Sequence, residues 1–362
     1  MTVRGAAAAI LAAIVVATPA RASKVCLTGT SYQLRWGEQE GPQDLVTPWP
    51  PQWTSGPYCF KMDTEIGVSV VADPGENIKR WKLTGARLFS FYALDYLWTV
   101  GEGPWKEPGQ TQALGDLPPW IDVVWLEGDV VIEMALPPPP PGGEDSAGVG
   151  GMAVTDSFSE CSSIYVVLDQ PKPPMANAWT GVLGYSCFWA MGEDTAAGAN
   201  RALTDALWTN GTYNGGEEAY TTDETDSGET FHLKSFLNHP NCPWGQCNDF
   251  ADFLICLSTS VGASDMRAQR SNAMVGPLYI TNYLSPAGKP GGSFPWAYHQ
   301  FALLSSNVWD GCINLYGYGV PKDWARDSTY QSQLVKHYNP SGTWLPTPSG
   351  GFTPLVTTNP PP

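Results

Sequence analysis

The sequence predicts an α+β protein, in which a β-sandwich-like N-terminal region precedes a buried helix packed on an antiparallel sheet. Three observations favour this class. Segments rich in β-branched and aromatic residues, separated by Gly and Pro, fill the chain as far as Leu136. A strongly apolar helical pattern covers residues 248–261 and ends at Gly262. Strand-like segments follow that helix, and a helix followed by antiparallel strands is typical of α+β domains.

The first 22 residues have the pattern of a secretory signal peptide. Arg4 supplies the positive start, residues 6–17 are apolar, and Ala20-Arg21-Ala22 matches a cleavage site. The apolar segment is shorter than the roughly 20 residues of a membrane-spanning helix, and no second such segment follows. We therefore expect a secreted or periplasmic protein of bacterial type, with no membrane span after signal cleavage.

Composition divides the rest of the chain into four parts. Residues 23–136 form the β-rich N-terminal domain, and the Pro- and Gly-rich residues 137–160 form a linker or exposed loop. The predicted α+β domain covers 161–325, and 326–362 is a Pro-rich C-terminal tail whose last dozen residues we expect to be disordered.

Local patterns predict individual elements within these parts. Glu127-Gly128-Asp129, between two apolar segments, predicts a hairpin turn. Apolar residues at helical spacing predict a helix over 193–207, and strands are expected at 274–283, at 298–304 and from Val308 to Leu315. The Gly-rich acidic segment 213–229 lacks periodicity and is interpreted as a mobile loop.

The net charge of −16 argues against nucleic acid as a ligand, because nucleic-acid binding needs clustered Lys and Arg. The acidic loop is interpreted as a solvated segment, and a Ca²⁺ site is the weaker alternative because the EF-hand spacing is absent. No other metal or cofactor is expected, since the zinc spacings C-x2-C and H-x3-H are missing. The carboxylates of that alternative Ca²⁺ site are Glu217, Glu218, Asp223, Glu224 and Asp226.

Eight cysteines remain after the signal peptide, and an oxidising compartment permits disulfide bonds. The expected bridges are Cys26–Cys59 and Cys161–Cys187, each within its own region. Cys256 lies on the apolar face of the predicted helix and is expected to be a small buried residue.

One cysteine stands in a reactive context. Cys247 follows a glycine turn, Trp244-Gly245-Gln246, and comes directly before the apolar helix. A thiol at a helix N-terminus lies at the positive end of the backbone dipole, beside amide groups without intrahelical partners. Both effects favour the thiolate, which is the nucleophilic form.

A histidine and an aspartate follow in the order that a Cys-His-Asp triad uses. His299 stands in an apolar strand pattern, and Asp310 follows 11 residues later, after the Ser305-Ser306-Asn307 turn. This spacing suits neighbouring antiparallel strands, so the carboxylate is expected to orient the imidazole that accepts the thiol proton.

Together these residues resemble the transglutaminase-like superfamily, a papain-related group with a Cys-His-Asp triad. The similarity rests on Gly245-Gln246-Cys247 with Asp249-Phe250-Ala251, on His299 with its apolar strand, and on Val308-Trp309-Asp310. It covers about 200–320. The resemblance implies a transglutaminase-like, papain-like core with Cys247 as nucleophile, His299 as general base and acid, and Asp310 as orienting group.

The resemblance also implies the chemistry and a second oxyanion donor. Enzymes of this group attack a carboxamide or peptide carbonyl, form a thioester and pass the acyl group to an amine or to water. The Cys247 backbone N–H would hold the oxyanion together with a second donor, for which Trp244, Gln246 and Trp208 are all candidates. Gln300 departs from the family pattern, since many relatives carry an apolar or aromatic residue after the histidine.

The leading hypothesis is an exported thiol acyltransferase or amidase that acts on a protein or peptide substrate. Two alternatives remain: a cysteine peptidase of the same fold, and a non-catalytic secreted module that binds a protein or a cell-wall glycan through aromatic side chains. The N-terminal domain is expected to recognise a cell-wall or other extracellular partner, or to position the catalytic domain.

Overall fold

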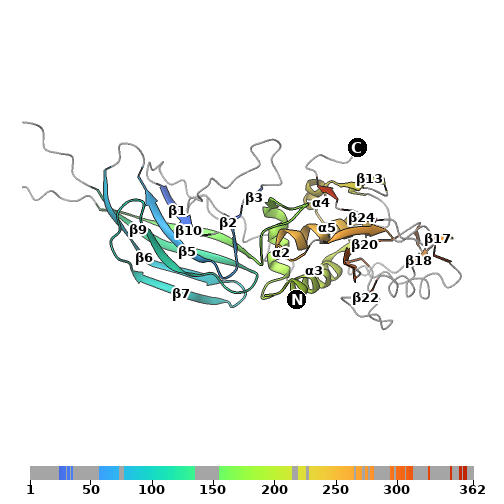
Figure 1. Cartoon of the computed structure of the whole chain (residues 1–362), viewed down its shortest axis with the longest axis horizontal. Coiled ribbons are helices and arrows are strands. Elements are labelled where there is room, and N and C mark those ends of the chain that lie inside the picture. Colours follow the sequence, from blue (N-terminus) through green and yellow to red (C-terminus); the bar gives the residue numbers. More distant parts are fainter. Residues whose placement is uncertain are drawn as a thin grey trace, which may run out of the picture.

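The computed structural model describes residues 24–29, 31–32, 34–35, 57–72, 77–134, 155–213, 219–225, 228–264, 266–270, 274–275, 278–280, 294–296, 299–305, 307–312, 325–326, 343–344, 350–352 and 354–356. Across these ranges the chain is mixed α+β, with most of its regular structure in sheets that are largely antiparallel. Figure 1 shows the N-terminal strands at one end of the molecule and the helices toward the other.

Two sheets enclose the first hydrophobic core. One has the order β1-β5-β8 and the other the order β2-β4-β10-β9-β6-β7. Inward-facing side chains from both sheets share one cluster, which includes Leu27 and Val68 from the smaller sheet and Trp81 and Leu126 from the larger. The strands are β1 (Lys24–Thr28), β2 (Ser31–Tyr32), β4 (Tyr58–Lys61), β5 (Glu65–Val71), β6 (Ile78–Ser90), β7 (Asp95–Glu102), β8 (Thr111–Asp116), β9 (Asp122–Met134) and β10 (Thr155–Val167).

The predicted hairpin turn at Glu127-Gly128-Asp129 is wrong, because β9 runs through it without a break. Buried and half-buried positions alternate from Asp122 to Ile132, and Gly128 takes a buried, inward position. Glu127 and Asp129 therefore both face outward, and the Arg87 side chain of β6 binds Glu127. A glycine between two acids is compatible with a strand when the period of two is kept on both sides.

The larger sheet also takes in part of the expected linker. Thr155–Val167 pairs along its length with β9, and its last four residues pair in parallel with β4. The expected boundary between linker and second domain, at 160/161, falls inside this strand. Nothing is described for 135–154, which include most of the Pro- and Gly-rich segment.

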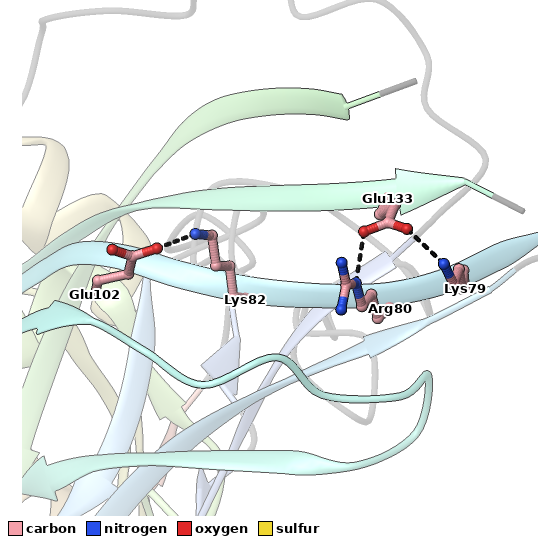
Figure 2. A network of polar contacts seen from close by, with 5 residues as sticks. All are labelled: Lys79, Arg80, Lys82, Glu102 and Glu133. Carbon is pink, nitrogen blue, oxygen red and sulfur yellow. Dashed lines mark hydrogen bonds and ion pairs between the residues drawn. The ribbon is translucent and has the colours of Figure 1, made fainter. Parts of the chain in front are cut away.

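The outer face of the larger sheet carries ion pairs between neighbouring strands (Figure 2). Lys79 and Arg80 of β6 bind Glu133 of β9 at 2.8 Å and 2.5 Å, and Lys82 binds Glu102 of β7. Such exposed pairs each contribute little to stability. They place charged side chains on the outward face of three adjacent strands.

Among its described residues, the second part contains the helices α2 to α5 and several small sheets. The five-stranded sheet, of order β22-β21-β20-β16-β24, carries the elements that matter most for the site. The elements are β3 (Leu34–Arg35), β11 (Ala178–Trp179), α2 (Thr180–Trp189), α3 (Ala196–Asn210), β12 (Thr212–Tyr213), β13 (Thr221–Thr225), β14 (Gly228–Phe231), α4 (Leu233–Asn238), β15 (Trp244–Gly245), α5 (Cys247–Ser260), β16 (Arg267–Arg270), β17 (Met274–Val275), β18 (Leu278–Ile280), β19 (Phe294–Trp296), β20 (Gln300–Leu304), β21 (Asn307–Trp309), β22 (Ala325–Arg326), β23 (Thr343–Trp344), β24 (Gly350–Phe352) and β25 (Leu355–Val356).

Helix α5 is the centre of the second core. All of its residues are buried, and it packs against α2, α3, β20 and β16. It ends where predicted: Gly262 has φ of +70°, a left-handed conformation that glycine adopts without strain. A Cβ at Gly262 would lie 2.4 Å from the Asp169 carbonyl oxygen, so close approach of the backbones also requires glycine here.

The two parts meet through the face of the larger sheet that points away from its own core. Along β4, Tyr58 and Phe60 belong to the first core, whereas the intervening Cys59 belongs to the second, together with Tyr165 of β10 and Cys187 of α2. The chain after β10 then runs along the end of α5, where the Leu168 N–H donates to the Val261 carbonyl at 3.2 Å.

Two further regions differ from the sequence predictions, and two others are not described. The segment interpreted as a mobile loop contains the β13–β14 hairpin, although 214–218 and 226–227 lie outside the described residues. The C-terminal tail supplies strands, since β24 pairs with β16 and β25 pairs with β14. The signal peptide and the expected strand residues after Cys312 are not among the described residues.

Neither expected disulfide bridge is formed in the described structure. Cys59 and Cys187, one member of each pair, are buried and carry free thiols. Disulfide bonding of the exported protein stays a prediction. Within the described residues, no helix combines the length and apolar character that crossing a membrane requires.

Candidate active site

The N-terminus of α5 is held by a reciprocal cap. Gln246 is the N-cap residue, and its side chain accepts a hydrogen bond from the backbone of the third helical residue, Asp249. In return, the Asp249 carboxylate accepts the Gln246 N–H at 2.8 Å. Gly245 is needed because a Cβ there would lie 2.8 Å from the Asp249 side chain. The Gly-x-Cys-x-Asp spacing is thus explained by helix capping.

Asp249 also ties the helix start to β13. Its Oδ1 accepts the backbone N–H groups of Tyr220 and Thr221 at 2.9 Å and 2.8 Å. Burial raises the pKa of this carboxyl to about 7, and its hydrogen bonds act in the opposite direction. Cys247, the first residue of the helix, is therefore fixed between the capping turn and a neighbouring strand.

The structure brings Cys247, His299 and Asp310 together. His299 directly precedes β20, and Asp310 directly follows β21, the antiparallel partner of β20. The His299 Nε2 lies 2.6 Å from the Asp310 Oδ2. The Cys247 side chain is the other neighbour that raises the pKa of this imidazole, so the thiol lies beside the ring whose Nε2 faces the carboxylate.

The carboxylate of Asp310 is anchored on its second oxygen. Its Oδ1 accepts the backbone N–H of Cys312 at 2.7 Å, which leaves Oδ2 directed at the imidazole. The His299 side chain has no exposed surface, and that of Asp310 is 5% exposed. An ion pair shielded from water in this way is screened far less than a surface pair.

The electrostatics of the imidazole follow from these neighbours. Burial lowers the pKa of His299, but the adjacent Asp310 carboxylate and the Cys247 side chain together raise the pKa by more than burial lowers it, and the resulting pKa is about 9. The ring is therefore cationic at neutral pH. An imidazolium held between a carboxylate and a sulfur atom stabilises a thiolate and can return a proton to a leaving group.

The three candidate oxyanion donors occupy different positions. Gln246 caps α5, whereas Trp244 is half-buried in β15 and stacks on the His239 ring, with ring centres 4.2 Å apart. Trp208 is half-buried in the last part of α3. Their role as the second oxyanion donor remains a prediction.

Two nearby features were not predicted from sequence. Cys312 is buried close to the triad, and burial together with Asp310 and Cys247 raises its thiol pKa. Glu229 of β14 is 3% exposed and receives a hydrogen bond from Gln300. Its sequence context is an acidic, Gly-rich segment typical of solvated loops, so no local signal marked it as buried.

The carboxylates of the alternative Ca²⁺ site lie outside the described side chains. Among the side chains that are described, no group of three His, Cys, Asp or Glu residues is arranged to hold a metal ion. No protein-family model matches the chain, and no curated protein matches it either. The function is therefore inferred from the site geometry and from the resemblance of the site's motifs.

Proposed function

We propose that this chain is an exported cysteine acyltransferase or amidase of the transglutaminase-like superfamily. The observation that carries the proposal is the arrangement of His299, whose Nε2 lies 2.6 Å from the Asp310 carboxylate and whose ring lies beside the Cys247 side chain that raises its pKa. The order of the three residues along the chain and the capped helix that begins at Cys247 support the same proposal.

The proposed reaction begins with Cys247 as the nucleophile and His299 as the proton carrier. In the proposed resting state the thiol proton already lies on the cationic His299, and the Cys247 thiolate attacks the carbonyl carbon of a protein or peptide carboxamide. The tetrahedral oxyanion is stabilised by the Cys247 backbone N–H, and each such donor is worth about 3 kcal/mol in the transition state. The imidazolium then gives its proton to the departing amine or ammonia, which leaves a thioester.

The second half of the reaction releases the acyl group. An amine or a water molecule attacks the thioester carbonyl, His299 takes a proton from the attacking group, and the sulfur leaves as the thiolate. Transfer to an amine and hydrolysis share every protein group up to this step. The peptidase alternative therefore differs from the acyltransferase in the acceptor, and amine incorporation into a glutamine peptide separates the two.

The signal-peptide pattern supports action outside the cytoplasm. For the two N-terminal sheets, we propose a role in positioning the helical part or in recognising an extracellular partner. Their outward face packs on α2 through Cys59 and Tyr165, which supports the positioning role.

The test is the alkylation rate of Cys247 in the native protein as a function of pH, read by peptide mass spectrometry. We expect fast labelling at pH 6, where an ordinary thiol with a pKa of about 8.5 is almost wholly protonated. His299→Ala should slow that labelling at least tenfold. Slow labelling that ignores the substitution would overturn the triad, and a non-catalytic binding module would then be the better description.

A further inference from the structure

A second cluster of buried polar side chains is centred on Gln300, the residue that directly follows His299 in the chain. The Gln300 Nε2 donates to the Glu229 Oε1 at 2.7 Å and to the Asp252 Oδ1 at 3.4 Å. The Thr221 hydroxyl donates to the second oxygen of Asp252 at 2.8 Å. The side chains of Gln300, Glu229 and Asp252 are at most 3% exposed.

Each member of this group comes from a different element. Gln300 begins β20, Glu229 belongs to β14, Asp252 lies in α5, and Thr221 begins β13. One amide therefore joins the strand that follows His299 to the helix that carries Cys247. The same amide also reaches the hairpin whose other strand provides the Thr221 N–H bound by Asp249.

The Gln300 amide contacts both carboxyls and so brings the side chains of Asp252 and Glu229 together. Burial and the neighbouring Glu229 raise the pKa of Asp252 well above its ordinary value. Asp249 faces Asp252 from the same helix and adds to this effect, and the thiol of Cys256 is a further titratable group beside it. The Gln300 amide donates to both members of this buried pair.

We infer that Gln300 is a positioning residue that, through Asp252 and Glu229, holds the strand of His299 in place against the helix of Cys247. The inference rests on the proposed function, in which His299 must stay within hydrogen-bond distance of Cys247. Asp252 lies five residues after Cys247, about 7.5 Å along the helix axis, and Gln300 lies next to His299. The contact of the Gln300 amide with Asp252, at 3.4 Å, thus joins the neighbour of the base to the helix of the nucleophile, and the contact with Glu229, at 2.7 Å, holds the amide in place.

The alternative is that the group stabilises the fold without acting on the triad. If the cluster positions the triad, its loss should let β20 slide or tilt, which moves His299 away from Asp310 and Cys247. If the cluster only stabilises the fold, His299 should stay in place. Those two neighbours keep the pKa of His299 at about 9. The titration of His299 is therefore a direct readout of position that does not depend on enzymatic turnover.

The experiment compares the full chain with Gln300→Met, which keeps the side-chain length and removes the amide. In ¹³C-histidine-labelled protein, we expect the His299 titration midpoint to fall by at least one pH unit toward 6.5. We expect Cys247 alkylation at pH 6 to slow at least tenfold. An unchanged His299 midpoint in Gln300→Met would overturn the inference.

Two further variants separate positioning from stability. Gln300→Met combined with Asp252→Asn restores an amide donor for Glu229 but does not reconnect β20, so it should regain stability to urea while the His299 midpoint stays low. Recovery of the midpoint in this double variant would contradict the positioning role. Thr222→Val removes the contact of Thr222 with His232 in the adjacent hairpin and should leave the His299 midpoint unchanged.

The outcomes also distinguish this inference from the proposed function. If wild-type Cys247 labels slowly but the His299 midpoint falls in Gln300→Met, the acyltransferase proposal fails and the positioning role stands. If Cys247 labels fast in a His299-dependent way and the midpoint does not move, the acyltransferase proposal stands and the positioning role fails.

Discussion

Replacing Asp310 with Asn tests the central ion pair with little change in shape. The amide oxygen can still accept the Cys312 N–H, which Asp310 binds at 2.7 Å. The amide nitrogen then faces the His299 Nε2, where the carboxylate oxygen lay at 2.6 Å. Because that nitrogen is a donor, the neutral ring must carry its proton on Nδ1. The Nδ1 atom can then no longer accept the Cys247 proton.

The magnitude follows from the titration of His299. Its pKa is about 9 in the folded protein against an ordinary value of 6.5, and a difference of about 2.5 units corresponds to roughly 3 kcal/mol. Since the folded pKa is raised, this stabilisation is fully present below about pH 6.5 and is lost as the pH rises through about 9. Asp310→Asn should therefore lose about 3 kcal/mol of unfolding free energy at pH 5.5 and clearly less at pH 9.5.

Urea unfolding of both proteins at the two pH values measures the effect, with Asp95→Asn as the control. Asp95 is exposed in β7 and binds the neighbouring Tyr96 N–H, so its replacement makes the same change in net charge far from the site. Alkylation of Cys247 at pH 6 should also slow at least tenfold in Asp310→Asn. An equal loss of stability at both pH values would refute the reasoning, because it would show that the imidazolium gains nothing from the carboxylate.

Two further predictions concern the ends of α5. Gly262→Ala should lose about 2 kcal/mol or more in urea unfolding, because the added Cβ would lie 2.4 Å from the Asp169 carbonyl oxygen at a φ of +70°. Gly85→Ala is the control, because Gly85 has φ of +64° with open space around it and its replacement introduces backbone strain alone. Equal losses of unfolding free energy in the two variants would contradict a steric clash at Gly262. Asp249→Asn removes a carboxyl whose pKa is raised to about 7 in the folded protein. The wild type should therefore lose stability as the pH rises from about 4 to about 7, and the variant should lose less over the same range. Parallel stability curves for Asp249→Asn and the wild type over that range would contradict the raised pKa.

Helix α5 was predictable because its signals are local. The expected range 248–261 differs by one residue at each end from the observed Cys247–Ser260. A wide apolar face marks the interior, and Gly262 marks the end. The hairpin that carries His299 and Asp310 was equally predictable from the sequence, since β20 and β21 are joined by the short turn that the sequence indicated.

The failures come from tertiary context. Helix α2 was not predicted, because Gly181 and Gly184 weaken a helical signal that burial against α5 and β10 overrides. The predicted turn at Gly128 assumed that a glycine between two acids ends a strand. Instead, β9 pairs with β10 on one side and with β6 on the other, and the strand continues past Gly128. Glu229 was missed because its partners lie far away in sequence, on α5 and β20.

The two aspartates of α5 show why the residues proposed to react could be predicted from the sequence, whereas the contacts that hold them in place could not. Asp249 and Asp252 both stand near the start of the helix, where carboxylates generally complement the dipole. Asp249 does cap the helix, through the Gln246 N–H at 2.8 Å. Asp252, almost one helical turn later, instead faces Gln300 and Glu229, contacts that nothing in its neighbourhood of the sequence specifies. Residues proposed to react lie at the ends of elements, where motifs are short and readable, whereas the residue proposed to align them acts through long-range contacts. Substitutions of Cys247 or Asp310 should thus alter the chemistry directly, and substitution of Gln300 should alter it through the position of His299.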